Sequence, residues 1–392
     1  MPLMKPQKLR EMREGLGVRE TCKRLTKAIK DKALHPSDFS IRDLAEGLIP
    51  DGREFVHAMN PARDTDGVSL LETVDSAAFK NITGQLLIRS VMDGYENPQF
   101  VGPRLAKTIP TDLNGEKIPG LTTLGDQNEI VGEGKPYPDA AIGEDWIETP
   151  ETLKRGRKLQ LTKEVLFFNK TGLILDQATE LGYNLGLNRD KRIIDLALGV
   201  TNTYRWKGTA YDTYQTTTPW VNVNASNALA DWSDIDDALQ LFGALVDPTS
   251  GEPILVMPTQ MIVHTSLRKT IDYIMRATQV VIDPNANAGT AQNQLWVPNN
   301  VLTAPYEIIS SPVIDQRYTA GSVTSTTWMF GDFQRAFAYM ENWPVQVMPM
   351  PSNSYIEYER DIVAGWRVSE RGTVAVKNPR YTQRNIAAGS GL

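Results

Sequence analysis

Apolar residues recur at helical spacing through the first hundred residues of the chain. Two short patterns are separated by a pair of glycines, and their apolar positions are Leu9, Met12, Leu16, Cys22, Leu25 and Ile29. Because residues three or four apart share one face of a helix, these patterns predict helices over 5–14 and 18–34. A further short helix is predicted after residue 40, and a longer one over 76–97.

The strongest helical pattern covers about 170–198. Its apolar stripe consists of Ile174, Ala178, Leu181 and Leu185. Gly199 is suited to close this helix, which would be about 40 Å long at ~1.5 Å per residue. Gly182 and Gly186 lie four residues apart within it. They either let another backbone lie close or are simply tolerated.

Residues 98–150 are rich in Pro and Gly and lack helical periodicity, which is unusual for so long a stretch of a compact domain. Alternation then appears in RKLQLTKE, where Leu159 and Leu161 share one face and the residues between them are polar. Together with a strand-like piece before it, this pattern predicts a two-stranded ribbon. Such a ribbon is marginal alone, so we expect it to pack on a partner surface.

The second half of the chain mixes short strands with helices. WSDIDDALQLFGAL predicts a helix with Ser233 as its N-cap, and the C-terminal region predicts two long strands around a turn at residues 370–372. The whole pattern indicates an α+β protein.

Composition limits the possible functions. The chain has 392 residues, of which 41% are hydrophobic, and a formal net charge of −6, so it can form a sizeable core and has no overall signature of nucleic-acid binding. Residues 1–32 nevertheless hold ten Lys or Arg against four Asp or Glu, so a basic arm precedes an acidic body.

Cys22 is the single cysteine, which excludes an internal disulfide and fits a reducing compartment. No apolar run predicts a membrane span or a signal peptide, so we expect a soluble protein.

Motifs for chemistry are absent. Residues 129–139, EIVGEGKPYPD, contain a Gly-Lys pair but lack the earlier Gly and the following Ser or Thr of a phosphate-binding loop. The three histidines are widely spaced, so we expect no metal site, no cofactor and no enzyme activity.

The acidic group Glu144, Asp145, Glu148 and Glu151 is either a carboxylate site or, more simply, a solvated ribbon face. The basic arm is either a solvated helix face or a contact with nucleic acid or an acidic neighbour.

The order of these parts and several stretches of the sequence resemble those of a known family. The stretches include FKNITGQLLIRSVMDGYENPQFVGPRL, GEKIPG, VGEGKPYPDAAIGEDWIETPETLKRGRKLQLTKEVLFFNKTGLILDQA, KRIIDLALGVTNTYRWKGTAYDTYQ and GDFQRAFAYMENWP. From about residue 40 to 385, the chain resembles the major capsid proteins of tailed bacteriophages with the Hong Kong 97-type capsid fold, in a subgroup related to Mu-like head subunits.

This resemblance implies an α+β capsid fold with five regions. They are an N-terminal arm with helices (1–125), an extended loop formed by the two-stranded ribbon (126–165), a peripheral domain in two parts (166–234, with a spine helix over 170–199, and 346–392) and an axial domain (235–345). The GEGKPYPD stretch would then set the direction of the extended loop rather than bind phosphate. The function implied is a structural subunit that assembles into the hexamers and pentamers of an icosahedral head around double-stranded DNA.

The resemblance also implies where subunits meet. The expected loop contacts are Glu144, Asp145, Glu148, Glu151, Lys154, Arg155, Arg157 and Lys158. Their expected partners on the next peripheral domain are Glu357, Glu359, Arg360, Arg367 and Arg371. Contact with DNA or a neighbouring subunit is expected of Lys5, Lys8, Arg10, Arg13, Arg19, Lys23, Arg24 and Lys27.

The expected partners are further copies of the chain, packaged DNA bound without sequence preference, and portal, scaffold or decoration proteins, with no membrane. The expected location is the virion, after assembly in the host cytoplasm. Two alternatives are an encapsulin-type compartment on the same fold, against which the long basic arm weighs, and an enzyme on an unrecognised α/β fold.

Overall fold

The computed structural model divides the chain into two compact units. Unit 1 contains residues 1–100, 153–189 and 343–372, and unit 2 contains residues 101–152, 190–342 and 373–392. The structure describes residues 6–31, 40–48, 74–120, 131, 133, 145–162, 171–201, 204–247, 251, 253–277, 280–282, 295–297, 306–350, 359 and 362–387. Three elements contribute residues to both units: α8 (Thr171–Ala197), β13 (Phe337–Pro349) and β14 (Ile362–Val376).

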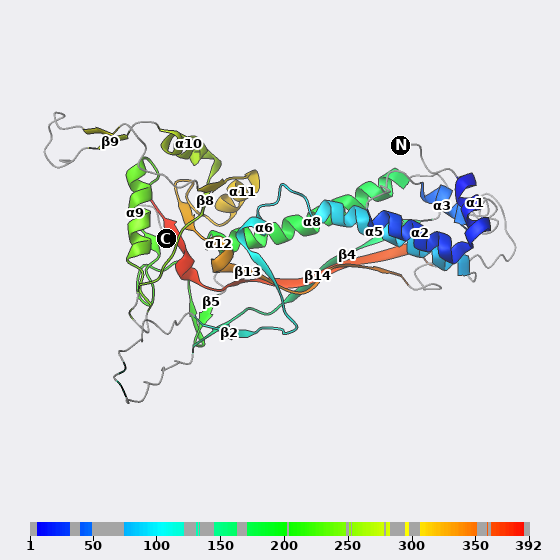
Figure 1. The fold of residues 1–392 in the computed structure, drawn as a ribbon, viewed down its shortest axis with the longest axis horizontal. Helices are drawn as coiled ribbons and strands as arrows, with labels where there is room; N and C mark the ends of the chain where they lie inside the picture. Colours follow the sequence, from blue (N-terminus) through cyan, green and yellow to red (C-terminus); the bar gives the residue numbers. More distant parts are fainter. Residues whose placement is uncertain are drawn as a thin grey trace. The chain divides into compact units, whose positions relative to one another are not determined.

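Unit 1 combines helices with long strands (Figure 1). Besides its share of the three long elements, it contains α1 (Pro6–Leu16), α2 (Val18–Lys30), α3 (Ile41–Leu48), α5 (Val74–Tyr95) and β4 (Leu153–Thr162). The predicted N-terminal helices are thus confirmed. Helix α1 contacts α2 and α3, and both of these contact α5. The apolar positions of the helical patterns, including Leu9, Leu25 and Ile29, are buried in the core of this unit.

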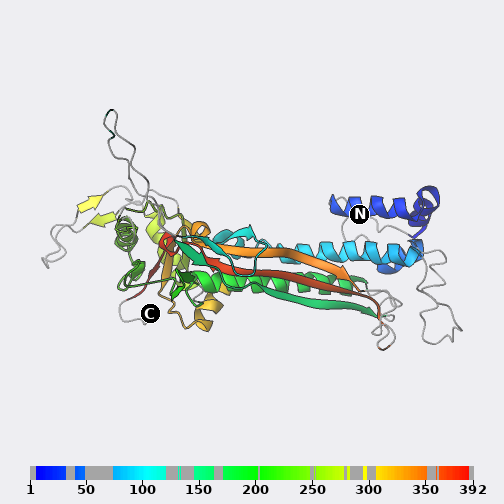
Figure 2. The same ribbon diagram turned by 90° about the horizontal axis from the view of Figure 1, so that it is seen from below.

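Two glycines of α8 allow α5 to lie directly against it. A Cβ atom on Gly182 would overlap the carbonyl oxygen of Val91, and one on Gly186 would lie 2.8 Å from the carbonyl oxygen of Tyr95. Both views show α5 and α8 side by side (Figures 1 and 2). The close approach of another backbone, one of the two interpretations of these glycines, is therefore the correct one.

The strands of unit 1 lie under this helix pair. In sheet order β13, β14 and β4 are adjacent, and Figure 2 shows them running side by side. Strand β14 pairs antiparallel with β4 from Thr162 to Leu153. Leu159, Leu161 and Trp366 pack into the same core as α5 and α8. The alternation of RKLQLTKE thus corresponds to one buried and one outward strand face, as predicted.

Unit 2 is built from short elements. They are α6 (Gly102–Leu105), β1 (Lys107–Pro110), β2 (Lys117–Pro119), β3 (Trp146–Glu148), β5 (Tyr204–Trp206), β6 (Thr209–Tyr211), β7 (Val223–Asn224), α9 (Trp232–Gly243), β8 (Gln260–Val263), η2 (Thr265–Leu267), α10 (Arg268–Arg276), β9 (Val280–Ile282), β10 (Leu295–Val297), β11 (Glu307–Ile309), α11 (Pro312–Ala320), β12 (Trp328–Gly331), α12 (Phe333–Ala336), η3 (Pro379–Tyr381) and β15 (Thr382–Asn385).

Two sheets organise unit 2. The first sheet has the strand order β11-β8-β12-β15-β7. Its two outer strand pairs are parallel and its two inner pairs are antiparallel. The second sheet has the strand order β2-β3-β5-β6, and all of its pairs are antiparallel. Strand β1 pairs parallel with the part of β13 that belongs to this unit. The central strand β12 is buried throughout, and Trp328 and Phe330 on one face pack against α9 and α10.

Three predictions about local structure are corrected. The turn predicted at residues 370–372 does not form, because β14 continues without a break from Ile362 to Val376. The N-cap of α9 is Asp231 rather than Ser233, because the side chain of Asp231 accepts a hydrogen bond from the first turn and Asp234 completes a capping box. The predicted ribbon between β3 and β4 does not form among the described residues. Instead β3 pairs with β2 and β5, while β4 pairs with β14. Strand β4 thereby pairs with the longer strand β14, and β3 becomes part of a four-stranded sheet, whereas a two-stranded ribbon alone is only marginally stable.

Candidate interaction surfaces

The antiparallel pair of β4 and β14 has two chemically different faces. Residues directly opposite one another in such a pair share a face. Leu159 lies opposite Trp366 and Arg155 lies opposite Glu370, so these four residues belong to the face that covers the core. Glu370 is only 2% exposed. Arg155 therefore points to the inner face rather than outward, which changes its expected role.

The outward face of this pair is basic. Lys158 lies opposite Arg367, and Lys154 lies opposite Arg371. We call these four residues the basic sheet face. Among the described residues of β4 and β14, this face carries no Asp or Glu. Like charges directly opposite one another destabilise a strand pair, so the arrangement fits a surface that meets an acidic partner.

The neighbouring strand β13 supports the arginines of this face. Nη2 of Arg367 donates a hydrogen bond to Sδ of Met348 over 3.0 Å. The guanidinium of Arg371 lies 5.4 Å from the ring centroid of Trp343, within the range of a cation–π contact. Both contacts hold the arginine side chains over the sheet.

A cavity of about 340 Å³ opens beside the basic sheet face. Its lining is mostly apolar and includes Leu159, Met348, Pro349, Met350 and Trp366. Lys158 and Arg367 lie at the same cavity. Sequence reasoning missed this groove, because the stretch VQVMPMP by itself indicates no more than a strand. The alternation of its methionines was the signal that could have indicated a second apolar surface.

A buried polar cluster lies behind the basic sheet face. The hydroxyl of Tyr95 donates to Oε2 of Glu370 over 2.9 Å, and Nη1 of Arg189 donates to the same hydroxyl over 2.7 Å. The guanidinium of Arg189 also lies 4.9 Å from the Tyr95 ring centroid. The cluster joins α5, α8 and β14, which fixes the strand that carries Arg367 and Arg371. No spacing pattern in the sequence indicates that these three residues meet.

The predicted acidic contacts of the loop, residues 144–151, belong to unit 2, and its predicted basic contacts, residues 154–158, belong to unit 1. Asp145 accepts a hydrogen bond from Nε1 of Trp206. Glu148 lies 3.7 Å from Nζ of Lys117, and Glu151 is exposed at the start of the chain segment that leads to β4. Glu144, Glu357 and Arg360 lie outside the described residues, and Glu359 is described and exposed. The structure therefore does not join these acids and bases in one ribbon.

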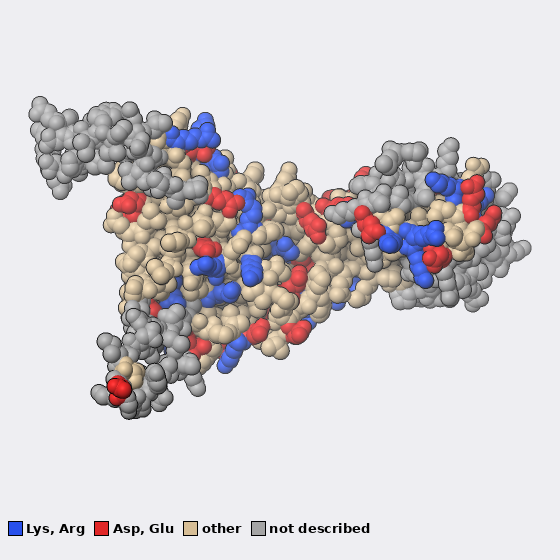
Figure 3. Space-filling view, in the orientation of Figure 1, with Lys and Arg blue, Asp and Glu red and all other residues tan. Residues whose placement is uncertain are grey.

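The basic arm has a mixed surface. Lys8, Lys23, Arg24 and Lys27 are exposed on α1 and α2, but the acids Glu11, Glu14 and Glu20 are exposed among them. Figure 3 shows blue and red side chains interleaved over these helices. Nε and Nη2 of Arg10 donate to the carbonyl of Glu46 at 3.2 Å, and Arg13 is half-buried. Lys5 and the side chain of Arg19 lie outside the described residues.

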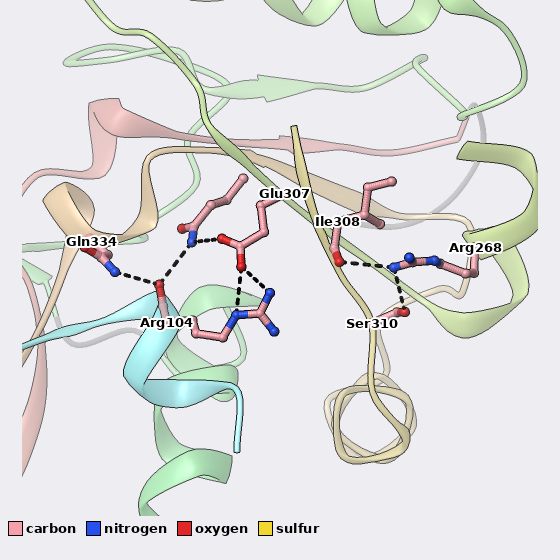
Figure 4. A network of polar contacts seen from close by, with 7 residues as sticks. Arg104, Arg268, Glu307, Ile308, Ser310 and Gln334 are labelled. Atoms are coloured by element: carbon pink, nitrogen blue, oxygen red, sulfur yellow. Dashed lines mark hydrogen bonds and ion pairs between the residues drawn. The ribbon is translucent and has the colours of Figure 1, made fainter. Parts of the chain in front are cut away.

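A polar network in unit 2 connects α6 to β8 and β11 (Figure 4). Arg104 donates two hydrogen bonds to Glu307, and Nε2 of Gln260 donates to the other carboxylate oxygen over 2.7 Å. Gln260 and Gln334 also donate to the carbonyl of Arg104. The bond from Gln260, followed by Arg104, lowers the pKa of Glu307. The network fixes the start of β8.

Within the part of the chain that the structure describes, no three or more His, Cys, Asp or Glu side chains lie together so that they could hold a metal ion. None of its helices combines the length and the apolar composition that a membrane span requires. His264 serves as a local cap, because its Nδ1 accepts a hydrogen bond from the backbone of Ser266 over 3.1 Å. Its Nε2 lies 3.6 Å from Asp315.

Comparison with known proteins gives a family match. Residues 146–385 match the family model described as phage capsid protein. This match covers more than half of the chain. It includes α8, β13, β14, the whole sheet β11-β8-β12-β15-β7 and the sheet β2-β3-β5-β6 except for β2. No curated protein matches the sequence.

Solved structures are similar at low identity. A virus-like particle from Pyrococcus furiosus matches at 12% identity and a TM-score of 0.42, over 76% of this chain and 97% of that one. The capsid of the cyanophage Pam1 matches at 13% identity and a TM-score of 0.43, over 76% and 93%. A phage-related protein from Bordetella bronchiseptica matches at 12% identity and a TM-score of 0.42, over 78% and 96%.

Proposed function

This chain belongs to the phage capsid protein family, and we propose from that premise that it assembles into the hexamers and pentamers of an icosahedral head enclosing double-stranded DNA. The expected α+β Hong Kong 97-type fold and the expected structural role are confirmed by the family match, and the protein is a virion component. Formation of homo-oligomers belongs to the proposal. Assembly in the host cytoplasm, and contacts with portal, scaffold or decoration proteins, belong to the proposal.

The observation that carries the proposal is the basic sheet face. We propose that it receives the acidic leg of the extended loop of a neighbouring copy, with Glu144, Asp145, Glu148 and Glu151 as the complementary charges. Single exposed ion pairs contribute only about 0–1 kcal/mol each, but a shell repeats them in every copy. Shells also need interface on several sides of each subunit, and a long loop supplies such area.

The inner position of Arg155 refines the set of contact residues. Arg155 lies on the core face opposite Glu370, so its contribution is to the subunit itself. Lys154, Lys158, Arg367 and Arg371 are the outward cations of the same strand pair and replace it in the proposed contact. Arg157 lies opposite the buried Val368, on the same strand face as Arg155, but its side chain is exposed, so it remains a proposed contact. The expected partners Glu357, Glu359 and Arg360 also remain proposals.

The expected domain boundaries remain proposals as well. We propose that residues 126–165 include the loop that reaches a neighbour, that residues 235–345 form the axial domain, and that 166–234 and 346–392 form the peripheral domain after the arm of 1–125. The arm has a mixed surface of cations and acids, which supports docking on a neighbouring subunit more than a continuous contact with DNA.

Charge reversal on the basic sheet face tests the proposed contact. The double variant Lys158→Glu/Arg367→Glu should fold normally, because both side chains are exposed, but should form no closed shells. The control Lys107→Glu/Lys269→Glu makes the same charge change at exposed sites elsewhere and should assemble like the unmodified chain. Negative-stain electron microscopy, with circular dichroism as the folding check, provides the measurement.

Three outcomes would decide the matter. Normal shells from the double variant would contradict the role of the basic sheet face. A wild-type chain that stays monomeric in every salt, even when produced with the other head proteins, would contradict assembly itself. Shells that contain no nucleic acid without nuclease treatment would contradict enclosure of DNA.

A further inference from the structure

The segment that leads into β8 exposes a row of apolar side chains. Val246 and Pro253 form an antiparallel bridge, and the amide of Ile254 donates to the carbonyl of Leu245 over 2.9 Å. Residues 253–258 then run on toward β8 with alternating burial. Leu255 is 88% exposed and Met257 is 81% exposed, whereas Val256 between them packs against the core under α9.

Successive side chains of an extended segment point to opposite sides, so alternate residues share a side. Pro253, Leu255 and Met257 therefore share one side with Val246, which is itself 50% exposed. We call these four residues the apolar row. Single exposed apolar residues are ordinary on protein surfaces and need no explanation. Large apolar side chains at alternating positions of one extended segment are a different pattern.

The main chain beside this row is also unpaired. In the described part of the chain, no hydrogen bond is made by the amides of Leu255, Val256 and Met257 or by the carbonyls of these residues. An extended segment with a row of free amides and carbonyls is a template for pairing with another strand. When a strand adds to a sheet edge, main-chain hydrogen bonds set the direction of the added strand, and apolar side chains supply the buried surface area.

We propose that residues 253–258 add as a strand to a second copy of this chain, with Leu255 and Met257 buried against that copy. This inference rests on the proposed function, because copies of the chain must meet in a shell. The segment ILVMP and its preceding proline carry no charge, so the contact offers nothing to the phosphates of a nucleic acid. Another extended polypeptide supplies both the main-chain partners and the apolar cover.

The segment is held in place before any partner arrives. Its start is fixed by the bridge to Val246, and its end is fixed at Gln260 by the bonds to Arg104 and Glu307 shown in Figure 4. A segment that is already extended loses little conformational freedom on binding, which favours association. The two prolines at its ends limit the pairing to the few residues between them.

Substitution of the two most exposed side chains tests the apolar part of this inference. Leu255→Ser/Met257→Ser should leave the melting temperature within a degree or two, since both side chains are mostly in water. It should raise the protein concentration needed for half-assembly at least tenfold, measured by sedimentation velocity. The control Leu113→Ser/Leu173→Ser removes leucines that are 55% and 52% exposed and should change that concentration less than twofold.

Hydrogen exchange tests the main-chain part. The amides of Leu255 and Met257, which point to the same edge of the extended segment, should exchange freely in the unassembled subunit and become at least a hundredfold slower in assembled particles. Unchanged exchange on assembly, or unchanged assembly of Leu255→Ser/Met257→Ser, would overturn this inference while leaving the proposed function intact. A wild-type chain that never assembles would instead contradict the proposed function, and this inference with it.

Discussion

The basic sheet face of unit 1 and the apolar row of unit 2 are both carried by extended chain, but they are supported in opposite ways. The basic sheet face lies on strands whose hydrogen bonds are made within the sheet, over a core formed by helices that touch backbone to backbone. The apolar row lies on a segment with one bridge at its start, and polar contacts fix the chain at either end.

Because of this difference, the two surfaces should respond differently to salt and to pH. Salt screens the contacts of the basic sheet face but leaves its apolar support unchanged. The apolar row makes contacts that salt does not weaken, but the ion pairs and hydrogen bonds that hold it respond to charge and protonation. Substitutions that weaken the support of one surface should therefore impair that surface and leave the other unchanged. The substitutions follow in order of decreasing expected effect.

The largest effect is expected at Gly182. In Gly182→Leu the new side chain meets the backbone of α5 at Val91, which cannot give way without separating the two helices. We expect a loss of more than about 4 kcal/mol in the free energy of unfolding, because overlap with rigid backbone exceeds ordinary overpacking of a core. Chemical denaturation measures it, with unit 1 losing its protection from hydrogen exchange first.

Gly172→Leu is the matched control for this prediction. It places the same side chain near the start of the same helix, where a Cβ has no neighbour within 4 Å. We expect a change below about 1 kcal/mol there. Equal losses from the two substitutions would mean that the close approach of α5 and α8 does not support the basic sheet face.

The second largest effect is expected at Asp247, next to the apolar row. Its carboxylate lies 3.3 Å from Nη1 of Arg380, and both side chains are almost fully buried. Asp247→Asn leaves the Arg380 charge without its ionic partner, which should cost about 3 kcal/mol, at the low end for breaking a buried pair because Asn still accepts a hydrogen bond. Hydrogen exchange of Ile254, which bonds to Leu245, should report the loss locally.

Asp237→Asn is the control for this substitution, since Asp237 is exposed on α9. It should leave both the free energy of unfolding and the exchange of Ile254 unchanged. If Asp247→Asn slowed assembly no more than this control, the buried pair would not be a support of the apolar row.

The sequence predicted the elements of unit 1 better than those of unit 2, for a physical reason. Long helices repeat their apolar positions many times, so α8 and its closing Gly199 could be located within a few residues. Strand partners follow from tertiary packing and not from local alternation, so the pairing of β4 with β14 instead of β3 could not be read from RKLQLTKE. Three-residue strands of unit 2 contain too little pattern to be placed at all.

The candidate surfaces show the same limit. The cations of β4 were identified from the sequence, but which of them face outward depends on the register with β14, and Arg155 proved to face the core side. Leu255 and Met257 belong to the stretch EPILVMP, whose apolar run by itself indicates a short buried strand. Their alternation with Ile254 and Val256 was visible, but only the missing strand partner shows that one side is open.

The smallest effect is expected from the titration of Glu307, at the far end of the apolar row. Because its pKa is lowered from the ordinary value of 4.5, its ionised form stabilises the fold fully above that value. This contribution is lost as the pH falls through the lowered pKa. The side chain is 43% exposed, so solvent screening limits the contribution to below about 1 kcal/mol.

Melting temperatures between pH 6 and pH 3, at steps of about half a unit, should therefore fall slightly more steeply for the wild type than for Glu307→Gln. The variant cannot ionise at this position but can still accept hydrogen bonds from Arg104 and Gln260, so the difference between the two curves isolates the charge. Curves that run parallel over this range would show that the charge of Glu307 does not stabilise the start of β8, and the end of the apolar row would then depend on the neutral hydrogen bonds alone.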